Sequence, residues 1–238
     1  MFFCPKYITI DMCVYISIVF ILVILKNFSY AKRLPANART GPHNKIILEI
    51  IYGSLLGDSY AERRILGNGT RICFYQEAIH KEYLIWLHSI IINIGYCSQT
   101  IPKIQTRLCK KGKIRLIMRF KTFTYQSLDW IHDNWYDNGI KRVPRDIKAY
   151  LSPLALAIWI IDDGSRSGKG LKFRINSFTY DDCLFLSNVL LELYNVRTSV
   201  QKAGYANQYV IYVFAESIDI LRHIVKPYIV NSMLYKLG

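Results

Sequence analysis

Two similar apolar segments, each carrying an aspartate near its end, constrain the fold of this chain more than any other feature. They read IYGSLLGDS at residues 51–59 and LAIWIIDDG at residues 156–164. Each has the composition of a buried helix, and the acids Asp58 and Asp163 lie 105 positions apart. A helix that occurs twice and delivers one acid per copy predicts a two-fold site with two carboxylates at its centre.

The predicted position of these two acids is electrostatically unfavourable. An aspartate at the C-terminal end of a helix faces the negative end of the helix dipole, and two such ends side by side add repulsion between like charges. Mg²⁺ binds through one or two carboxylates, with waters and phosphate oxygens as its other ligands. We therefore expect Asp58 and Asp163 to hold a divalent metal. Either segment alone could simply be the end of an ordinary helix, so the prediction depends on the presence of both.

The chain is strongly basic. Its 31 lysines and arginines outnumber 17 aspartates and glutamates, which gives a net charge of +14, and seven basic residues with no acid fall between residues 101 and 120. This excess predicts a polyanionic partner. The six cysteines form no CxxC pair, so the sequence indicates neither a zinc knuckle nor a disulfide framework.

The first 44 residues differ from the rest. A hydrophobic run covers residues 13–25, which is shorter than the roughly 20 residues that a spanning helix needs. It has neither the basic start nor the cleavage site of a signal peptide. A membrane anchor and a vestigial extension translated from upstream sequence are both consistent with it. Residues 31–44 contain two prolines and a glycine and are predicted to be a linker.

From residue 45 onward, one order of elements is predicted twice: helix, strand, helix, hairpin, helix. In the first copy these are residues 46–57, 70–75, 76–93, a hairpin of 103–109 and 113–121, and 125–136. In the second they are a helix capped by Ser152 and Pro153, residues 172–177, a helix from Thr179 to 194 with a capping box at Asp182, a hairpin of 198–203 and 208–214, and a helix from 217. The predicted division is an extension at 1–44 and repeats at 45–145 and 146–238.

The two motif helices are expected to dock against each other. Gly53 and Gly57 lie four residues apart, on one helix face where a second backbone can approach closely. The matching positions of the second segment hold Ile158 and Asp162, which are not small. We therefore expect an asymmetric contact, with Ala155 or Ala157 as the nearer surface.

These features resemble the LAGLIDADG homing endonucleases, in the monomeric two-repeat form that organelle introns encode. The resemblance covers about residues 45 to 238 and makes the eighth residue of each segment, Asp58 and Asp163, a catalytic acid. It implies an α+β fold of two pseudo-symmetric αββαββα-like halves, packed through the motif helices, with saddle-shaped DNA-binding sheets. The segment KRVP at 141–144 resembles the Lys-x-(Ile/Val)-Pro segment of the family, and MLYKL at 233–237 resembles its C-terminal basic element. Lys141 and Lys236 are therefore candidate active-site lysines.

The resemblance implies a site-specific endonuclease that mediates intron homing by cutting both strands of a long, asymmetric double-stranded DNA target. Mg²⁺ between Asp58 and Asp163 would stabilise charge at the phosphate and activate a water, and Lys141 and Lys236 would neutralise developing charge. Candidate DNA-binding residues on or beside the predicted strands are Arg71, Tyr75, Arg107, Lys110, Lys111, Lys113, Arg115, Arg119, Lys172, Arg174, Asn176, Arg197 and Gln201.

An alternative function uses the same scaffold. An intron maturase, which is a splicing cofactor that binds its own intron RNA, would need the same basic surfaces. A third class, a small membrane protein, would account for residues 7–25 but for none of the duplication. The abundance of Ile, Phe, Tyr, Asn and Lys is typical of an AT-rich organelle genome, so the mitochondrion is the expected location and the chloroplast the alternative.

Overall fold

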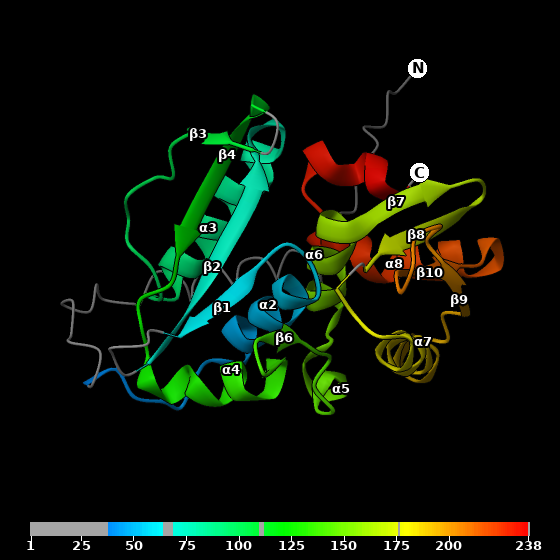
Figure 1. The fold of residues 1–238 in the computed structure, drawn as a ribbon, viewed down its shortest axis with the longest axis horizontal. Helices are drawn as coiled ribbons and strands as arrows, with labels where there is room; N and C mark the ends of the chain where they lie inside the picture. Colours follow the sequence, from blue (N-terminus) through cyan, green and yellow to red (C-terminus); the bar gives the residue numbers. More distant parts are fainter. Residues whose placement is uncertain (1–37, 64–68, 110–111, 176, 238) are drawn as a thin grey trace, which may run out of the picture.

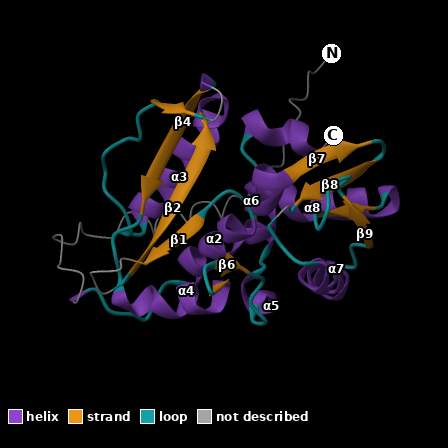
Figure 2. Cartoon of the chain, viewed as in Figure 1, coloured by secondary structure: helices purple, strands orange, loops and turns teal. Residues whose placement is uncertain are grey.

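Two four-stranded antiparallel sheets lie on either side of a central pair of helices (Figure 1). The structure is a computed structural model that describes residues 38–63, 69–109, 112–175 and 177–237. The strand orders are β1-β2-β4-β3 and β7-β8-β10-β9, so both sheets have the same topology. Helices cover one side of each sheet (Figure 2). The predicted α+β architecture of two related halves is therefore confirmed.

Each half has the element order αββαββα. The first half consists of α2 (Lys45–Leu56), β1 (Tyr60–Arg63), β2 (Thr70–Glu77), α3 (Lys81–Asn93), β3 (Gln105–Leu108), β4 (Ile114–Lys121) and α4 (Asp129–Trp135). A short connection follows, with β5 (Tyr136–Asp137), β6 (Ile140–Lys141) and α5 (Ile147–Tyr150). The second half consists of α6 (Pro153–Asp163), β7 (Gly164–Ser167), β8 (Gly170–Arg174), α7 (Tyr180–Tyr194), β9 (Thr198–Lys202), β10 (Tyr209–Val213) and α8 (Ile218–Val225), and ends in the 3-10 helix η7 (Asn231–Leu237).

Local sequence signals account for several element boundaries. The Ser152 hydroxyl accepts a hydrogen bond from the amide of Ala155 at 3.3 Å, and Pro153 opens helix α6. Thr179 and Asp182 form the predicted capping box at the start of α7. Asn44 caps α2 by accepting from the amide of Ile46 at 2.8 Å. These polar caps satisfy amides that the first helical turn leaves without partners.

The hydrophobic pattern missed one strand in each half. Strands β1 (YAER) and β7 (GSRS) pair with β2 and β8 directly after the motif helices. Both have four residues and lack β-branched side chains, so they carry little strand signal. The predicted helix start at residue 76 is also wrong, because β2 continues to Glu77 and α3 begins only at Lys81. Strand β8 ends at Arg174 rather than at residue 177.

The central helices α2 and α6 approach each other through the two glycines of the first segment. A Cβ placed on Gly53 would lie 2.8 Å from the Cα of Ala155, and one placed on Gly57 would collide with the side chain of Asp162. The contact is therefore asymmetric, with Ala155 as the near surface. Both helices are otherwise fully buried around this seam, as Leu55 and Trp159 illustrate.

The hydrophobic run at residues 13–25 lies outside the described part of the chain. Among the residues that the structure describes, no helix is long and apolar enough to cross a bilayer.

Candidate active site

Asp58 and Asp163 lie at the ends of the two central helices. Asp163 is the last residue of α6, and Asp58 follows Gly57, the C-cap residue of α2. Both acids line one cavity of about 200 Å³, together with Lys141 and Arg174. The structure thus brings together the two carboxylates that the duplicated segments predicted.

The two predicted lysines approach the acids in corresponding ways. The Nζ of Lys141, at the end of β6, donates to the carbonyl oxygen of Ser59 at 2.9 Å and to that of Gly57 at 3.3 Å. The Nζ of Lys236, in η7, donates to the carbonyl oxygen of Gly164 at 2.9 Å. Each lysine therefore holds the backbone beside one acid. This arrangement follows the pseudo-symmetry of the two halves.

Burial makes charge costly for all four groups. Burial, and then the negative charge of Asp58, raise the pKa of Asp163 to about 8 against the opposing effect of Lys141 and Lys236. Burial likewise raises the pKa of Asp58, which a hydrogen bond from Gln76 and the two lysines oppose. Burial lowers the pKa of Lys141 to about 8 and also lowers that of Lys236. Asp58, Asp163 and Lys141 line one cavity, and a cluster of acids and bases with perturbed pKa values is typical of a functional site.

Two further residues belong to this cluster, although the sequence did not identify either as a site residue. Gln76 Nε2 donates to Asp58 Oδ2 at 2.9 Å and to Asp162 Oδ1 at 2.8 Å. The amide of Asp58 donates to Asp162 Oδ2 at 3.4 Å. Gln76 therefore joins the two helix ends from strand β2. The available signals were a buried polar residue inside the apolar strand TRICFYQE and the acid directly before Asp163.

The donor set fits a divalent metal. In the described part of the chain, no three side chains of His, Cys, Asp or Glu are close enough to hold a metal by themselves. Asp58 and Asp163 supply two carboxylates on one cavity, and Mg²⁺ commonly takes one or two carboxylates and completes its coordination with waters and phosphate oxygens. A cation between them would also relieve the repulsion from Asp58 that helps to raise the pKa of Asp163.

One face of the first sheet is rich in arginine. Strand register puts Tyr75 opposite Arg119 and Arg107 opposite Arg115, and alternation along β2 puts Arg71 on the same face. A cavity of about 640 Å³ is lined by Tyr75, Arg107 and Arg119, and its lining also includes Asp58. Five predicted DNA-binding residues therefore share a face that adjoins Asp58.

The second sheet has a corresponding polar face. Lys172 and Arg174 lie on alternate positions of β8, and both line a cavity of about 360 Å³ with Lys202 and Gln208, which the sequence did not single out. Gln201 contacts Ser199 from β9. Arg197 instead precedes β9 and is ion-paired with Glu216 at 2.6 Å. Lys113 is exposed beside β4, and Lys110, Lys111 and Asn176 lie outside the described residues.

The arrangement of two related halves around paired helix-end acids defines the class of the protein. The sequence model of the LAGLIDADG DNA endonuclease family matches residues 48–221, so the chain belongs to this family. In structure it is similar to the homing endonuclease I-WcaI bound to its DNA recognition sequence, with a TM-score of 0.71 over 92% of each chain. The sequence identity is 22%, so this likeness concerns the fold.

The named relatives include both maturases and endonucleases. The chain is 52% identical over 197 residues to the cytochrome b mRNA maturase bI2 of Debaryomyces hansenii, a match that covers 83% of this chain and 75% of that protein. It is 48% identical to the maturase of the same name from Saccharomyces cerevisiae, over 89% of this chain but only 52% of the yeast protein. The intron-encoded endonuclease ai4 of Dictyostelium discoideum is 33% identical over 60% of this chain and 93% of that protein.

Proposed function

We propose that this protein is a site-specific DNA endonuclease that cuts both strands of a double-stranded target and thereby mediates intron homing. The observation that carries the proposal is the cavity that Asp58 and Asp163 share, together with a lysine that binds the backbone beside each acid. A binding protein would have no need to gather acids where a polyanion must approach, because they would repel its phosphates. Membership in the LAGLIDADG DNA endonuclease family supports the same conclusion.

Asp58 and Asp163 would hold the divalent metal, with Mg²⁺ as the expected ion. When bound, the metal supplies charge stabilisation at the phosphate and lowers the pKa of an attacking water. Gln76 holds the carboxylate of Asp58 in one orientation through its 2.9 Å hydrogen bond. Lys141 lies on the same cavity, and Lys236 holds the backbone next to Asp163. The two lysines would neutralise charge that develops on the phosphates, one in each half-site.

The proposed target is long and asymmetric. The two sheets have equivalent topology but carry different side chains on their polar faces. Arg107, Arg119 and Tyr75 line the cavity on one sheet, and Lys172, Arg174 and Lys202 line the cavity on the other. A single chain with two unequal sheets can contact two different half-sites, so we expect it to act as a monomer. Base edges in the major groove differ for all four base pairs and can specify such a target.

A second function is favoured by the names of two relatives. The proteins from Debaryomyces hansenii and Saccharomyces cerevisiae are named cytochrome b mRNA maturases. We therefore propose, as an alternative or additional activity, that the chain assists the splicing of its own intron RNA. Both names also support a mitochondrial location and an intron of the cytochrome b gene as the host.

One pair of assays tests both functions. Purified protein is incubated with DNA that spans the intron-free exon junction of its host gene, with Mg²⁺ or with EDTA, and in parallel with the unspliced precursor RNA. The proposal expects double-strand cleavage with Mg²⁺ only, and loss of cleavage in a variant with both Asp58→Asn and Asp163→Asn. If the unmodified protein leaves the DNA intact and accelerates splicing, the chain is a maturase and the endonuclease proposal is wrong.

A further inference from the structure

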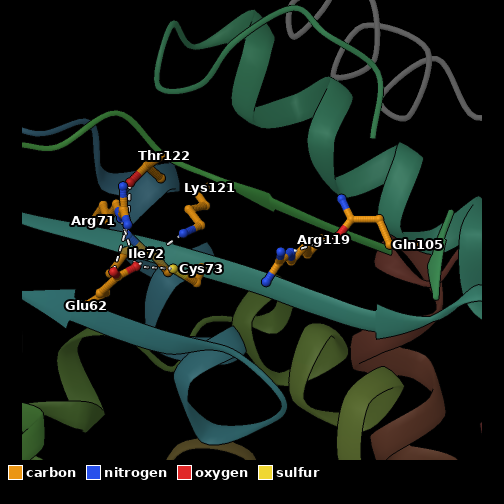
Figure 3. A network of polar contacts seen from close by, with 8 residues as sticks. All are labelled: Glu62, Arg71, Ile72, Cys73, Gln105, Arg119, Lys121 and Thr122. Carbon is orange, nitrogen blue, oxygen red and sulfur yellow. Dashed lines mark hydrogen bonds and ion pairs between the residues drawn. The ribbon is translucent and has the colours of Figure 1, made fainter. Parts of the chain in front are cut away.

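A bidentate ion pair crosses the two strands that follow the first motif helix. Glu62 of β1 and Arg71 of β2 are direct partners in the antiparallel register. Arg71 Nε donates to Glu62 Oε2 at 2.8 Å, and Arg71 Nη2 donates to Glu62 Oε1 at 2.7 Å (Figure 3). Two parallel hydrogen bonds fix the plane of a guanidinium group as well as its position.

Glu62 also binds two other neighbours. The Nζ of Lys121 donates to Glu62 Oε2 at 3.3 Å, and the thiol of Cys73 donates to the same oxygen at 3.3 Å (Figure 3). The hydrogen bond from Arg71, assisted by Cys73 and Lys121 and opposed by burial, lowers the pKa of Glu62 to about 2. The carboxylate is therefore ionised at neutral pH, and the group of two cations and one anion keeps a net positive charge.

This group lies on the polar face of the first sheet. Alternation along β2 puts Arg71 and Cys73 on the same face as Tyr75, and Cys73 and Lys121 line the cavity that contains Tyr75 and Arg119. The side chain of Arg71 retains 18% exposure. An acid on a surface that meets phosphates would ordinarily weaken DNA binding. We therefore expect Glu62 to have a function there that offsets this repulsion.

The geometry leaves one edge of the guanidinium available. Glu62 occupies Nε and one hydrogen of Nη2. The opposite edge carries the hydrogens of Nη1 and the second hydrogen of Nη2, and within the described residues Nη1 has no hydrogen-bond partner. Guanine presents O6 and N7 side by side in the major groove, and an arginine that donates to both atoms is the commonest specific contact to a base.

We propose that Arg71 reads a guanine in the major groove of the target and that Glu62 is the positioning residue that aims it. The inference rests on the proposed function, because it needs a DNA duplex on the first sheet. Arginine has many rotamers, and fixing it in the free protein removes part of the ordering cost of binding. A contact to phosphate would require no such fixed orientation, since charge alone supplies most of its attraction.

The chain offers a control on β1, the strand that carries Glu62. Arg63 pairs with Thr70 in the register and faces α4, where it forms ion pairs with Asp129 and Asp133. Arg63→Ala therefore removes one arginine from β1 on the face that turns away from the proposed DNA surface. A general effect of charge or of sheet stability should appear in this variant as well.

The test selects bound sequences from a pool of duplex DNA with a randomised central segment, in EDTA so that no cleavage occurs. The unmodified protein should enrich guanine at one position that Arg71→Ala no longer distinguishes, a loss of roughly 5- to 150-fold in preference. Arg71→Lys, which keeps the charge, should lose the same preference. Glu62→Ala should weaken the preference at that position only, and Arg63→Ala should leave it unchanged.

Other results would overturn the inference in distinct ways. If Glu62→Ala strengthens binding to every sequence equally, Glu62 only repels phosphates and does not position Arg71. If Arg71→Ala weakens binding to all DNA sequences equally, Arg71 contacts phosphate. If Glu62→Ala alone abolishes a preference for cytosine, Glu62 itself reads the base. If the unmodified protein enriches no DNA sequence but selects from a matched RNA pool, the endonuclease proposal fails and the guanine contact with it.

Discussion

The side chain of Asp162 occupies the space beside Gly57 that a Cβ would need. A Cβ built on Gly57 would lie 2.6 Å from Asp162 Oδ2, which is far inside van der Waals contact. This acid replaces the glycine of the first segment at the same motif position. The glycine on one helix therefore accommodates the larger residue on the other, and the seam depends on their combination.

Gly57→Ala should destabilise the protein by about 1–3 kcal/mol, because overpacking a tight contact forces side chains or backbone to shift. Adding Asp162→Gly should recover part of this loss, so the two changes should not be additive. Gly53→Ala is the control, because a Cβ at this position would collide with the backbone of Ala155. Asp162→Gly should therefore not relieve the destabilisation caused by Gly53→Ala. Urea unfolding of the single and double variants measures the coupling, and additive effects for Gly57 and Asp162 would contradict the packing argument.

Asp58→Asn and Asp163→Asn should each abolish double-strand cleavage and keep DNA binding within about an order of magnitude. Each change removes one of the two proposed anionic metal ligands, whereas the proposed DNA-binding faces of the sheets stay intact. Asp162→Asn is the matched control, because it changes the adjacent acid, which is hydrogen-bonded to Gln76. We expect it to slow cleavage by roughly 10- to 100-fold without abolishing it. Gel-shift and cleavage assays on one target separate the effects, and cleavage that survives Asp58→Asn would rule out this site.

Lys141→Ala and Lys236→Ala should each slow the cut in one DNA strand more than in the other, by roughly 10²-fold. The reason is that Lys141 holds the backbone beside Asp58 and Lys236 holds the backbone beside Asp163. A nicked intermediate should therefore accumulate, and labelling each strand separately identifies the slow cut. Lys148→Ala, which removes an exposed lysine paired with Glu192, should change neither strand. Equal slowing of both strands by Lys141→Ala would contradict the assignment of one lysine to each half.

Much of the fold and the centre of the site could be predicted from sequence. The duplicated segments carry a long apolar signal, so helices α2 and α6 and the pairing of Asp58 with Asp163 followed from periodicity and repetition. The capping residues at Ser152 and Thr179 marked helix starts because their chemistry is local.

Long-range contacts were the part that sequence could not supply. Strands β1 and β7 are short, and their pairing with β2 and β8 depends on the helix that precedes them rather than on their own composition. Gln76 was assigned to a helix, whereas the sheet turns its side chain toward acids that lie 18 and 86 residues away. The pairing of Arg71 with Glu62 likewise depends on strand register, which no local pattern specified.

The protein without metal should be least stable near pH 8. The pKa of Asp163 rises from 3.8 to about 8 on folding, so between these values the folded state holds a proton that the unfolded chain releases, and the free energy of unfolding falls as pH rises. The pKa of Lys141 falls from 10.5 to about 8. Between about 8 and 10.5 the unfolded chain holds the extra proton, so the lysine makes stability rise again with pH.

Thermal unfolding in EDTA between pH 5 and pH 10 measures this minimum. Asp163→Asn should flatten the fall in stability below pH 8 and leave the rise in stability above pH 8. Lys141→Met should leave the fall and flatten the rise. Saturating Mg²⁺ should raise the melting temperature most near pH 8 and above, because it competes with the proton for the carboxylates. Cleavage at subsaturating Mg²⁺ should increase with pH through about 8 for the same reason. If the melting temperatures of Asp163→Asn and of the unmodified protein have the same dependence on pH below pH 8, the carboxyl of Asp163 is not the group that titrates there.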